Sequence, residues 1–219
     1  PRLLATNGHI KRQKSSGSSL EQTKCTLENM ALNKNYWKNK NVLITGHTGF
    51  KGGWLCNMLI HFGAKVSGIS LKPDNEKNIF VATKLNERIQ QSIFCDICDF
   101  KEFQRIVDST SPEVIFHCAA QPIVSESFSN PYLTFSTNAL GTLNLMEICR
   151  SVSSLEALVV VTTDKVYENQ EWPWPYREND TLGANDPYSA SKTCAEFITE
   201  SYNRTFFSKE DVGVSTVRA

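Results

Sequence analysis

The stretch NVLIT at 41–45, followed by GHTGFKGG at 46–53, decides the fold of this chain. The first five residues have the continuous apolar centre of a buried strand, and apolar positions over 50–62 recur with the spacing of a helix. Between them Gly46, Gly49 and Gly52 follow one another as G-x-x-G-x-x-G. Glycines there permit a tight turn and let backbone N–H groups approach a pyrophosphate at the positive end of the helix dipole. The stretch predicts a dinucleotide-binding unit, and the alternative is a tight turn without a ligand.

Outward from this unit, short apolar runs alternate with longer amphipathic ones. Strands are expected at 41–45, 65–71, 89–94, 113–118, 157–163 and 212–218, and helices at 50–62, 100–109, 133–152 and 188–206. Asp186 as N-cap and Pro187 at the first helical position favour a helix start at that point, after one long loop over 168–186. The alternation predicts an α/β fold, a doubly wound Rossmann parallel sheet with helices on both faces.

Composition divides the chain into two parts. Residues 1–33 are basic and Ser-rich, and we expect a disordered head there, followed by an NAD(P)-binding Rossmann domain at 34–219. Residues 1–40 hold eight Lys/Arg and two Asp/Glu, whereas 41–219 hold fifteen and twenty-one, and an acidic body disfavours a nucleic-acid partner. No run of 18 apolar residues predicts a membrane span. Because the sixth predicted strand ends next to Ala219, we expect a chain that lacks a C-terminal substrate-binding region.

Seven cysteines are spread through the predicted strands and helices. An odd number in such places favours reduced, mostly buried thiols and a cytoplasmic protein. Cys95 and Cys98 have the C-x-x-C spacing, but no second pair of Cys or His follows at the spacing of a zinc site. We therefore expect no metal site.

Tyr188 and Lys192 stand four residues apart and so share one face of the last predicted helix. A phenol has a pKa near ~10, so acting as a base near pH 7 requires a fall of about 3 units, or about 4 kcal/mol. A neighbouring lysine cation and an oxidised nicotinamide can supply this. The same spacing occurs at Tyr36 and Lys40, but before the first strand. Position favours Tyr188, because the carboxyl ends of parallel strands form the ligand crevice.

Thr163, Asp164 and Lys165 follow the fifth predicted strand and so reach the same crevice. The alternative for these residues is capping of the strand end with a surface ion pair. At the end of the second strand, an acidic residue would bind the ribose 2′-hydroxyl of NAD. Lys72 stands there instead, with Asp74 slightly later, and a lysine suits a 2′-phosphate. These residues do not decide between NAD and NADP as the cofactor.

Together these motifs resemble the extended short-chain dehydrogenase/reductase family, and within it the nucleotide-sugar dehydratases and epimerases. The resemblance runs in unbroken order over about 36–219 and is most specific to the 4,6-dehydratases that act on CDP-glucose. The segments that carry it are TGHTGFKG (45–52), DICD (96–99), HCAAQP (117–122), STNALGT (136–142), TTDKVY (162–167), ENQEWPWPYREND (168–180) and DPYSASK (186–192).

This resemblance implies a lyase of deoxysugar synthesis. CDP-glucose would lose water and become CDP-4-keto-6-deoxyglucose through an internal hydride transfer that leaves NAD as it began. The chain as printed is expected to be inactive by itself. A homodimer is implied for the full-length protein, formed through the helices at 133–152 and 188–206.

Each catalytic role is likewise implied by the resemblance. Tyr188 would take the proton of the sugar 4-hydroxyl, and Lys192 would lower the pKa of Tyr188. Thr163 would hydrogen-bond the 4-oxygen, and Asp164 would protonate the departing 6-hydroxyl as a general acid. Lys165 stands where related dTDP-glucose dehydratases have Glu. It would act as the base at carbon 5 only if desolvated, and otherwise it would stabilise the enolate.

The resemblance also implies which residues surround the cofactor. They are Gly46, Gly49, Phe50, Lys51, Gly52, Asp96, Ile97, Ala119, Ala120, Gln121, Tyr188 and Lys192. Asn138 is expected to position the active-site helix or its water. His117 is expected to be a strand histidine with satisfied hydrogen bonds rather than a catalyst.

Two other functions are compatible with these motifs. A nucleotide-sugar 4-epimerase shares the glycine turn and the Tyr188–Lys192 pair but needs no acid to expel a hydroxyl, so Asp164 disfavours it. A non-catalytic dinucleotide-binding fragment is the second alternative, because function depends on the whole site.

Overall fold

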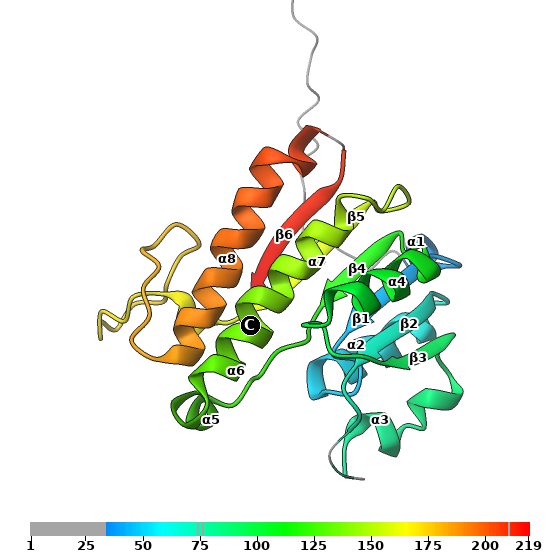
Figure 1. The fold of residues 1–219 in the computed structure, drawn as a ribbon, viewed down its shortest axis with the longest axis horizontal. Coiled ribbons are helices and arrows are strands. Elements are labelled where there is room, and N and C mark those ends of the chain that lie inside the picture. The colour runs from blue at the N-terminus through cyan, green and yellow to red at the C-terminus, as the bar shows by residue number, and fades with distance from the viewer. Residues whose placement is uncertain (1–33, 74, 76, 210) are drawn as a thin grey trace, which may run out of the picture. The chain divides into compact units, whose positions relative to one another are not determined.

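In the described residues, six strands form one parallel sheet in the order β3-β2-β1-β4-β5-β6 (Figure 1). The computed structural model describes residues 34–73, 75, 77–209 and 211–219, so the predicted head and Asp74 lie outside the described residues. The strands are β1 (Asn41–Thr45), β2 (Lys65–Ser70), β3 (Gln91–Phe94), β4 (Val114–His117), β5 (Ala157–Thr162) and β6 (Gly213–Arg218). All neighbouring pairs are parallel, and the order reverses between β1 and β4. The predicted doubly wound Rossmann fold is confirmed.

Helices alternate with these strands. They are α1 (Lys34–Trp37), α2 (Phe50–His61), α3 (Ile79–Ala82), α4 (Phe100–Thr110), α5 (Val124–Ser129), α6 (Pro131–Phe135), α7 (Gly141–Cys149) and α8 (Pro187–Thr205). Shorter turns are η2 (Leu85–Glu87), η3 (Ser136–Leu140), η4 (Asp164–Val166) and η5 (Phe207–Lys209). The sequence did not predict α1, α3 and α5, which at four to six residues are too short to show a helical repeat. The start of α8 is as predicted, because the Asp186 side chain accepts a hydrogen bond from the backbone N–H of Ser189 at 2.9 Å.

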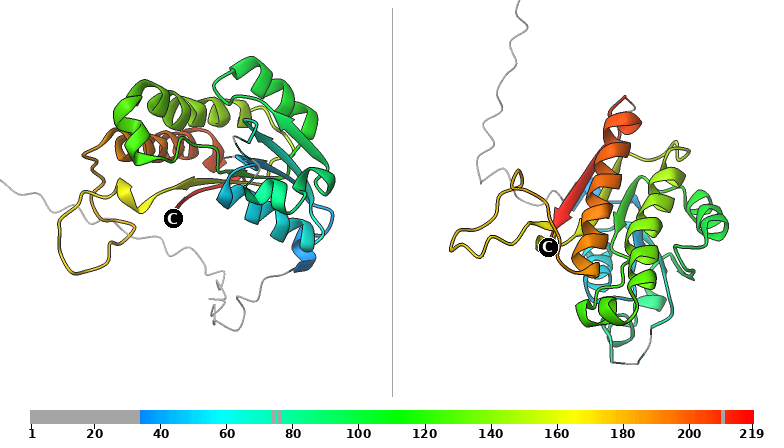
Figure 2. Two further views of the ribbon diagram at one scale, coloured as in Figure 1. Left: turned by 90° about the horizontal axis from the view of Figure 1, so that it is seen from below. Right: turned by 60° about the vertical axis from the view of Figure 1, so that its left-hand side comes forward.

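Two apolar clusters hold the helices against the two faces of the sheet. In β1, Leu43 belongs to one cluster, while its neighbours Val42 and Ile44 belong to the other. The first cluster packs α4 and α7 on the sheet, and the second packs α2 and α3. Figure 2 shows these two sets of helices on opposite sides. A strand that is buried on both faces carries a continuous apolar run, and for that reason NVLIT predicted β1 as a buried strand.

The predicted helix at 133–152 is interrupted. It begins earlier, at Pro131, and passes from α6 into α7 through η3, a turn of π-helix. Within that turn Asn138 is buried, accepts a hydrogen bond from the backbone N–H of Gln121 (2.8 Å) and donates to the Ser191 hydroxyl of α8 (2.9 Å). These contacts come from distant parts of the sequence, so the local pattern could not indicate the wider turn. Such turns often occur at functional sites.

Candidate active site at the carboxyl edge of the sheet

The glycine turn joins β1 to α2 at the carboxyl edge of the sheet. Gly46 has φ 75°, and a Cβ there would lie 2.7 Å from the backbone nitrogen of Ala119, which follows β4. A Cβ on Gly52 would lie 2.2 Å from the carbonyl oxygen of Gly46. Gly49 is the N-cap of α2 and leaves the start of that helix without a side-chain cap. These residues fit a dinucleotide pyrophosphate, because the turn keeps side chains away from the positive end of α2.

A chain of buried hydrogen bonds links this turn to Asn138. The backbone N–H of Ala119 donates to Thr45 Oγ1 (3.1 Å), which lies 2.7 Å from His117 Nδ1. His117 Nε2 lies 3.2 Å from Thr142 Oγ1, and that hydroxyl donates to the Asn138 carbonyl oxygen (2.7 Å). A neutral ring with its proton on Nε2 satisfies every pair in this chain. His117 is therefore the satisfied strand histidine that the sequence predicted.

His47, inside the glycine motif, has a buried ring. A Cβ on Gly68 of β2 would come within 2.3 Å of that ring, and its Nε2 lies 2.8 Å from Ser92 Oγ on β3. Burial lowers the pKa of His47 to about 4. Burial also lowers the pKa of His117 to about 3, and the Lys192 charge contributes to that shift. Both histidines are thus neutral parts of the folded core beneath the site.

These two histidines should make the fold acid-sensitive. Each histidine has a folded-state pKa below the unfolded value of 6.5. Its contribution to the free energy of unfolding is therefore complete above pH 6.5 and is lost as the pH falls toward 4. At pH 5 the free energy of unfolding should be lower than at pH 7.5 by about 2 kcal/mol for each histidine. Urea unfolding at the two pH values measures this. In His117→Gln the loss of unfolding free energy between pH 7.5 and pH 5 should be about half that of the parent. In His61→Gln, a change at an exposed histidine, the loss should be the same as in the parent. An unchanged pH dependence in His117→Gln would contradict the assignment.

Tyr188 and Thr163, which the sequence placed at one site, are in contact. Tyr188 lies in the first turn of α8 and is hydrogen-bonded with Thr163, the residue after β5. The sequence predicted that Lys192 and an oxidised nicotinamide lower the pKa of Tyr188, and the surroundings of the phenol in the structure act in the opposite direction. Burial raises its pKa, the Thr163 hydrogen bond opposes this, and the carboxylates of Asp164 and Asp186 add to the rise.

Lys192 lies one helical turn after Tyr188 and is buried. Its Nζ donates to the carbonyl oxygen of Val161 in β5 at 2.9 Å. Burial lowers the pKa of Lys192 to about 8, and the Lys51 ammonium of the glycine turn acts in the same direction. Lys192 is thus electrostatically coupled to the predicted cofactor turn.

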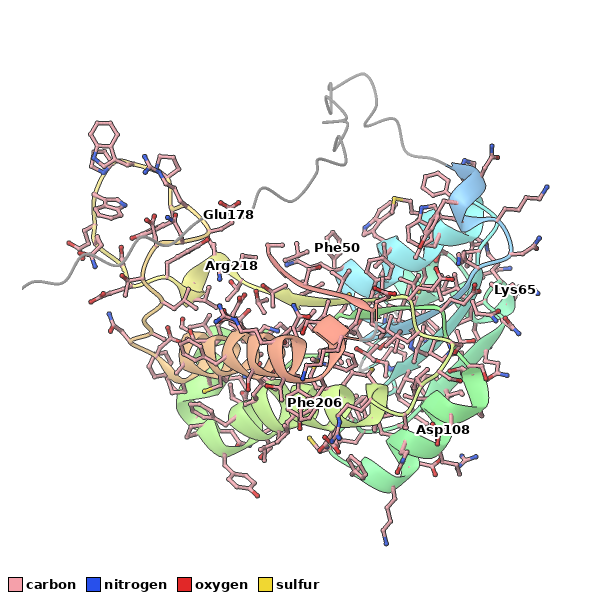
Figure 3. All side chains as sticks on the ribbon, turned by 90° about the horizontal axis from the view of Figure 1, so that it is seen from above. Phe50, Lys65, Asp108, Glu178, Phe206 and Arg218 are labelled. Carbon is pink, nitrogen blue, oxygen red and sulfur yellow. The ribbon has the colours of Figure 1, made fainter. Side chains whose placement is uncertain are left out.

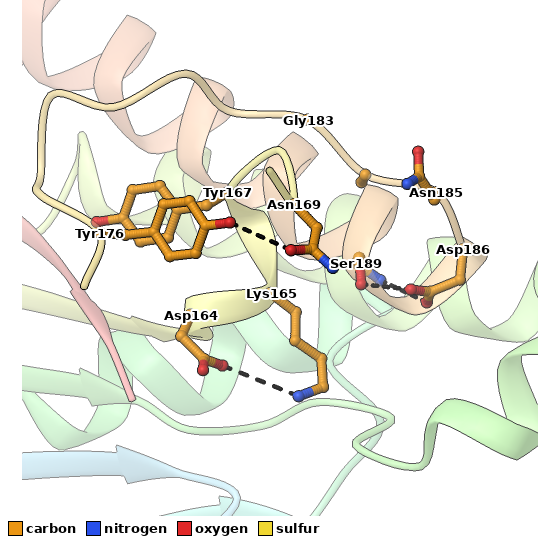
Figure 4. A pocket seen from close by; sticks show the side chains of 10 residues that line it. Asp164, Lys165, Tyr167, Asn169, Tyr176, Gly183, Asn185, Asp186 and Ser189 are labelled. Carbon is orange, nitrogen blue, oxygen red and sulfur yellow. Dashed lines mark hydrogen bonds and ion pairs between the residues drawn. The ribbon is translucent and has the colours of Figure 1, made fainter. Parts of the chain in front are cut away.

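Asp164 and Lys165 project from η4 into a pocket of about 370 Å³ (Figure 4). The lining residues come from η4, the following loop and the start of α8: Asp164, Lys165, Tyr167, Asn169, Tyr176, Gly183, Ala184, Asn185, Asp186 and Ser189. The nearest approach of the Lys165 ammonium to the Asp164 carboxylate is 4.0 Å, and both side chains are more than half exposed. Thr163 Oγ1 donates to Asp164 Oδ1 at 3.2 Å. A carboxylate and a cation therefore lie together in the pocket, and a hydroxyl is bonded to the carboxylate.

Some predicted cofactor residues have their side chains occupied elsewhere. Ile97 is buried in the core beside Gly141, and its carbonyl oxygen accepts a hydrogen bond from Asn144 (2.9 Å). The Gln121 amide is held by Thr134 Oγ1 (2.8 Å) and the backbone of Ile123. The backbone N–H and carbonyl oxygen of Gln121 are both bonded to Asn138, so neither position leaves a side chain free to approach a ligand.

The remaining predicted cofactor residues stand at the start of α2 or just after β3 and β4. Phe50 is three-quarters exposed at the start of α2, and Lys51 Nζ donates to the Ala219 carbonyl oxygen at 3.1 Å. Asp96 follows β3 and accepts a hydrogen bond from the backbone N–H of Cys98 (2.9 Å). Ala120 follows β4 and is half-buried.

Two further charged residues border the site and were not predicted. Glu196 on α8 and Arg218 on β6 form an ion pair at 3.0 Å. The Y-x-x-x-K-x-x-x-E spacing places Glu196 on the same helical face as Tyr188 and Lys192, and that spacing was the available signal.

Within the part of the chain that the structure describes, no helix is long and apolar enough to cross a membrane. Among the same residues, no three His, Cys, Asp or Glu side chains gather as metal ligands.

Known proteins resemble this chain in sequence and in fold. A CDP-glucose 4,6-dehydratase of Salmonella typhimurium is 42% identical over 193 residues, which are 86% of this chain and 54% of that protein. A GDP-mannose 4,6-dehydratase of Sordaria araneosa is 32% identical over 76% of this chain and 30% of its own length. The structure of a dTDP-glucose 4,6-dehydratase from Streptomyces venezuelae, solved with NAD bound, superposes with a TM-score of 0.70 at 24% identity. That superposition covers 81% of this chain and 54% of the other.

The chain spans about half the length of the Salmonella and Streptomyces proteins. The sequence model of one family, described as GDP-mannose 4,6 dehydratase, matches residues 43–209. This match includes the glycine turn, Thr163, Asp164 and the Tyr188–Lys192 pair. Because it covers more than half of the chain, the chain belongs to the GDP-mannose 4,6 dehydratase family.

Proposed function

We propose that the protein is a nucleotide-sugar 4,6-dehydratase that converts CDP-glucose to CDP-4-keto-6-deoxyglucose. The observation that carries this proposal is the meeting of Tyr188, Thr163 and Asp164 at one pocket-bearing edge of the sheet. Dehydration needs a base for a hydroxyl and an acid for a leaving hydroxyl, whereas epimerisation needs no such acid. The 42% identity with the Salmonella CDP-glucose 4,6-dehydratase supports CDP-glucose as the substrate.

In this reaction Tyr188 accepts the proton of the sugar 4-hydroxyl, and Thr163 donates a hydrogen bond to the 4-oxygen. Asp164 gives a proton to the 6-hydroxyl, which leaves as water. A nicotinamide at the glycine turn would supply the group that holds a hydride between carbon 4 and carbon 6. The proton of carbon 5 would pass to water, which would return a proton to Asp164, and Tyr188 would give the proton of the 4-hydroxyl to carbon 5, so substrate and product differ by one water. Because burial raises the pKa of Tyr188, positive charge beside it has to favour the phenolate. Lys192, with a pKa of about 8, carries such a charge at pH 7.

Lys165 is proposed to stabilise the enolate at carbon 5 rather than to act as the base. Its side chain is 54% exposed and lies 4.0 Å from the Asp164 carboxylate. A lysine becomes a base near neutral pH when burial disfavours its charged form, and neither the exposure nor the neighbouring carboxylate does so. A cation that faces the pocket can instead attract the negative charge that develops on the enolate oxygen.

The cofactor is proposed to be NAD, held at the turn of Gly46, Gly49 and Gly52 with Phe50 and Lys51. The related Streptomyces dehydratase was solved with NAD, which supports this choice. Thermal-shift titrations with NAD and NADP compare the two cofactors without relying on turnover.

The assay that tests the proposed function uses the longest form of the protein that its gene encodes. Incubation with CDP-glucose and NAD should produce a 4-ketosugar, detected by its absorbance after addition of alkali. Parallel incubations with dTDP-glucose and GDP-mannose test the nucleotide preference. Formation of CDP-galactose without a ketosugar would contradict the dehydratase and favour the epimerase. Cofactor binding without conversion of any of these substrates would favour a binding-only role.

We also propose a homodimer formed through α8 and through the segment from α6 to α7, which corresponds to the predicted helix at 133–152. α6 and α8 lie side by side, and each presents an exposed aromatic side chain as an apolar patch: Tyr132 on α6 is 83% exposed and Phe197 on α8 is 55% exposed. A second copy of the chain would bury both patches, as the family resemblance implies. We expect light scattering after size exclusion to show a dimer, and Phe197→Asp to give a monomer. Trp174→Asp, an exposed change in the loop over 168–186, is the control and should remain dimeric. A monomeric parent protein would contradict the proposal.

A further inference from the structure

Glu196 is a buried carboxylate in line with the catalytic pair. It follows Tyr188 by eight residues and Lys192 by four, so all three side chains lie on one face of α8. Its exposed fraction is only 5%. A buried carboxylate is costly unless it is paired and hydrogen-bonded, so its partners indicate what it does.

The hydrogen bonds of the Glu196 carboxylate all go to residues in the carboxyl-terminal halves of β5 and β6. It accepts from Thr162 Oγ1 at the end of β5 and from Thr216 Oγ1 on β6 (2.9 Å). It also accepts from Nε and Nη2 of Arg218, at 3.2 and 3.0 Å. Thr162 directly precedes Thr163, so Glu196 ties the catalytic helix to the strand end that carries the acid. The same hydrogen bonds fix the orientation of the Arg218 guanidinium.

The third nitrogen of the Arg218 guanidinium reaches the loop at 167–182, which supplies part of the pocket lining. Its Nη1 donates to the Tyr167 hydroxyl (2.8 Å) and to the carbonyl oxygen of Glu178 (3.0 Å). The guanidinium also lies over the Tyr167 ring, 4.8 Å from its centre. Figure 3 shows Arg218 beside Glu178 at the end of β6. Tyr167 lines the pocket, and its ring stacks on that of Tyr176, 5.0 Å away.

The base of this loop is closed by backbone contacts. Tyr167 forms a bridge with Leu182, and the backbone N–H of Glu168 donates to the carbonyl oxygen of Thr181 (2.9 Å). Glu178 lies further into the loop than these contacts. Arg218 therefore holds the loop both at its base and beyond it.

We propose that Arg218, oriented by Glu196, is a positioning residue that holds the loop at 167–182 as the wall of the substrate pocket. This inference rests on the proposed function, because it takes the pocket to be the sugar-nucleotide site. Among the described residues, the hydrogen bonds of the Arg218 side chain reach Glu196, Tyr167 and Glu178, and none reaches the glycine turn or Tyr188. Its loss should therefore affect the binding of CDP-glucose far more than the binding of NAD.

Arg218→Lys is the decisive variant. Lysine keeps the positive charge opposite Glu196, but a single ammonium cannot reproduce the planar fork that reaches three groups. Losing hydrogen bonds to a charged donor weakens an equilibrium by about tenfold or more. We expect the KM for CDP-glucose to rise by about tenfold, with kcat and the NAD dissociation constant within about threefold of the parent. Arg204→Lys, at an exposed Arg–Glu pair on the same α8, is the matched control and should leave both unchanged.

Limited trypsin digestion supplies a readout that does not depend on turnover. Arg177 lies in the loop, next to Glu178, and its side chain is exposed. Cleavage after Arg177, identified by the mass of the fragments, should be faster in Arg218→Lys than in the parent and in Arg204→Lys. Tyr167→Phe removes one acceptor of Arg218 but keeps the stacked ring, so it should give a smaller acceleration. Thermal midpoints measured alongside show whether each variant is folded.

The outcomes separate this inference from the proposed function. A parent that does not convert CDP-glucose overturns the proposed function, and the digestion still tests whether Arg218 holds the loop. If the parent is active and Arg218→Lys has the same KM for CDP-glucose as the parent, the positioning role is overturned, even if cleavage accelerates. Equal cleavage rates in parent and Arg218→Lys overturn the loop contact itself. A raised KM together with faster cleavage supports the inference.

Discussion

Replacing Asp164 with asparagine should lower the rate of ketosugar formation from CDP-glucose by about 10²- to 10⁴-fold. That loss corresponds to about 3–5 kcal/mol of transition-state stabilisation. Asparagine has the same shape and keeps the oxygen that accepts the Thr163 hydrogen bond at 3.2 Å. It has no acidic proton to give to the 6-hydroxyl, so hydroxide would have to leave without protonation. The steps before water loss do not need this proton and should continue.

Exchange with heavy water distinguishes loss of the acid from general damage to the site. Once carbon 4 is a ketone, the proton on carbon 5 is acidic and can exchange with solvent. In heavy water, CDP-glucose recovered from Asp164→Asn should therefore carry deuterium at carbon 5, detected by mass spectrometry. Asp108→Asn, an exposed change on α4, is the control and should form product at the parental rate. Full activity in Asp164→Asn would remove Asp164 from the acid role.

The sheet could be predicted because its signals are local. The apolar run at 41–45, the glycines after it and the Asp186–Pro187 start of α8 are each contained within a few residues, and each is confirmed. The π-helical turn at Asn138 depends on contacts with Gln121 and Ser191, which lie 17 and 53 residues away. Such contacts have no signature in the sequence of the helix itself.

The candidate site likewise has some features with a local signal in the sequence and others without one. Four-residue spacing was enough to pair Tyr188 with Lys192, but the Glu196–Arg218 pair spans 22 residues and exists only because β6 lies beside β5. The lowering of the Tyr188 pKa by Lys192 and an oxidised nicotinamide stays a prediction, whereas its rise through burial had no signal in the sequence, because burial depends on the packing of α8. The sequence around His47 could not indicate that its ring is buried, because its neighbours Gly68 and Ser92 belong to β2 and β3.

Replacing Tyr188 with phenylalanine should lower turnover of CDP-glucose by about 10²- to 10⁴-fold, at an earlier step than Asp164→Asn does. Phenylalanine fills the same 9% exposed position, so the packing of α8 should be retained. Without the phenol, no group in this place accepts the proton of the 4-hydroxyl and carbon 4 stays an alcohol. The carbon-5 proton then never becomes acidic. CDP-glucose recovered from Tyr188→Phe in heavy water should carry no deuterium at carbon 5.

Tyr36→Phe is the matched control, because Tyr36 and Lys40 repeat the Y-x-x-x-K spacing. There the Lys40 ammonium lies 5.3 Å from the centre of the Tyr36 ring and is bound by Glu113 and Glu156 before the start of β1. Full activity in Tyr36→Phe and none in Tyr188→Phe would show that position at the carboxyl edge makes this spacing catalytic. Binding of NAD should persist in Tyr188→Phe, because Lys192 and the glycine turn are intact. Deuterium at carbon 5 in Tyr188→Phe would contradict the role of Tyr188 as base, since it would mean that carbon 4 is oxidised without the phenol.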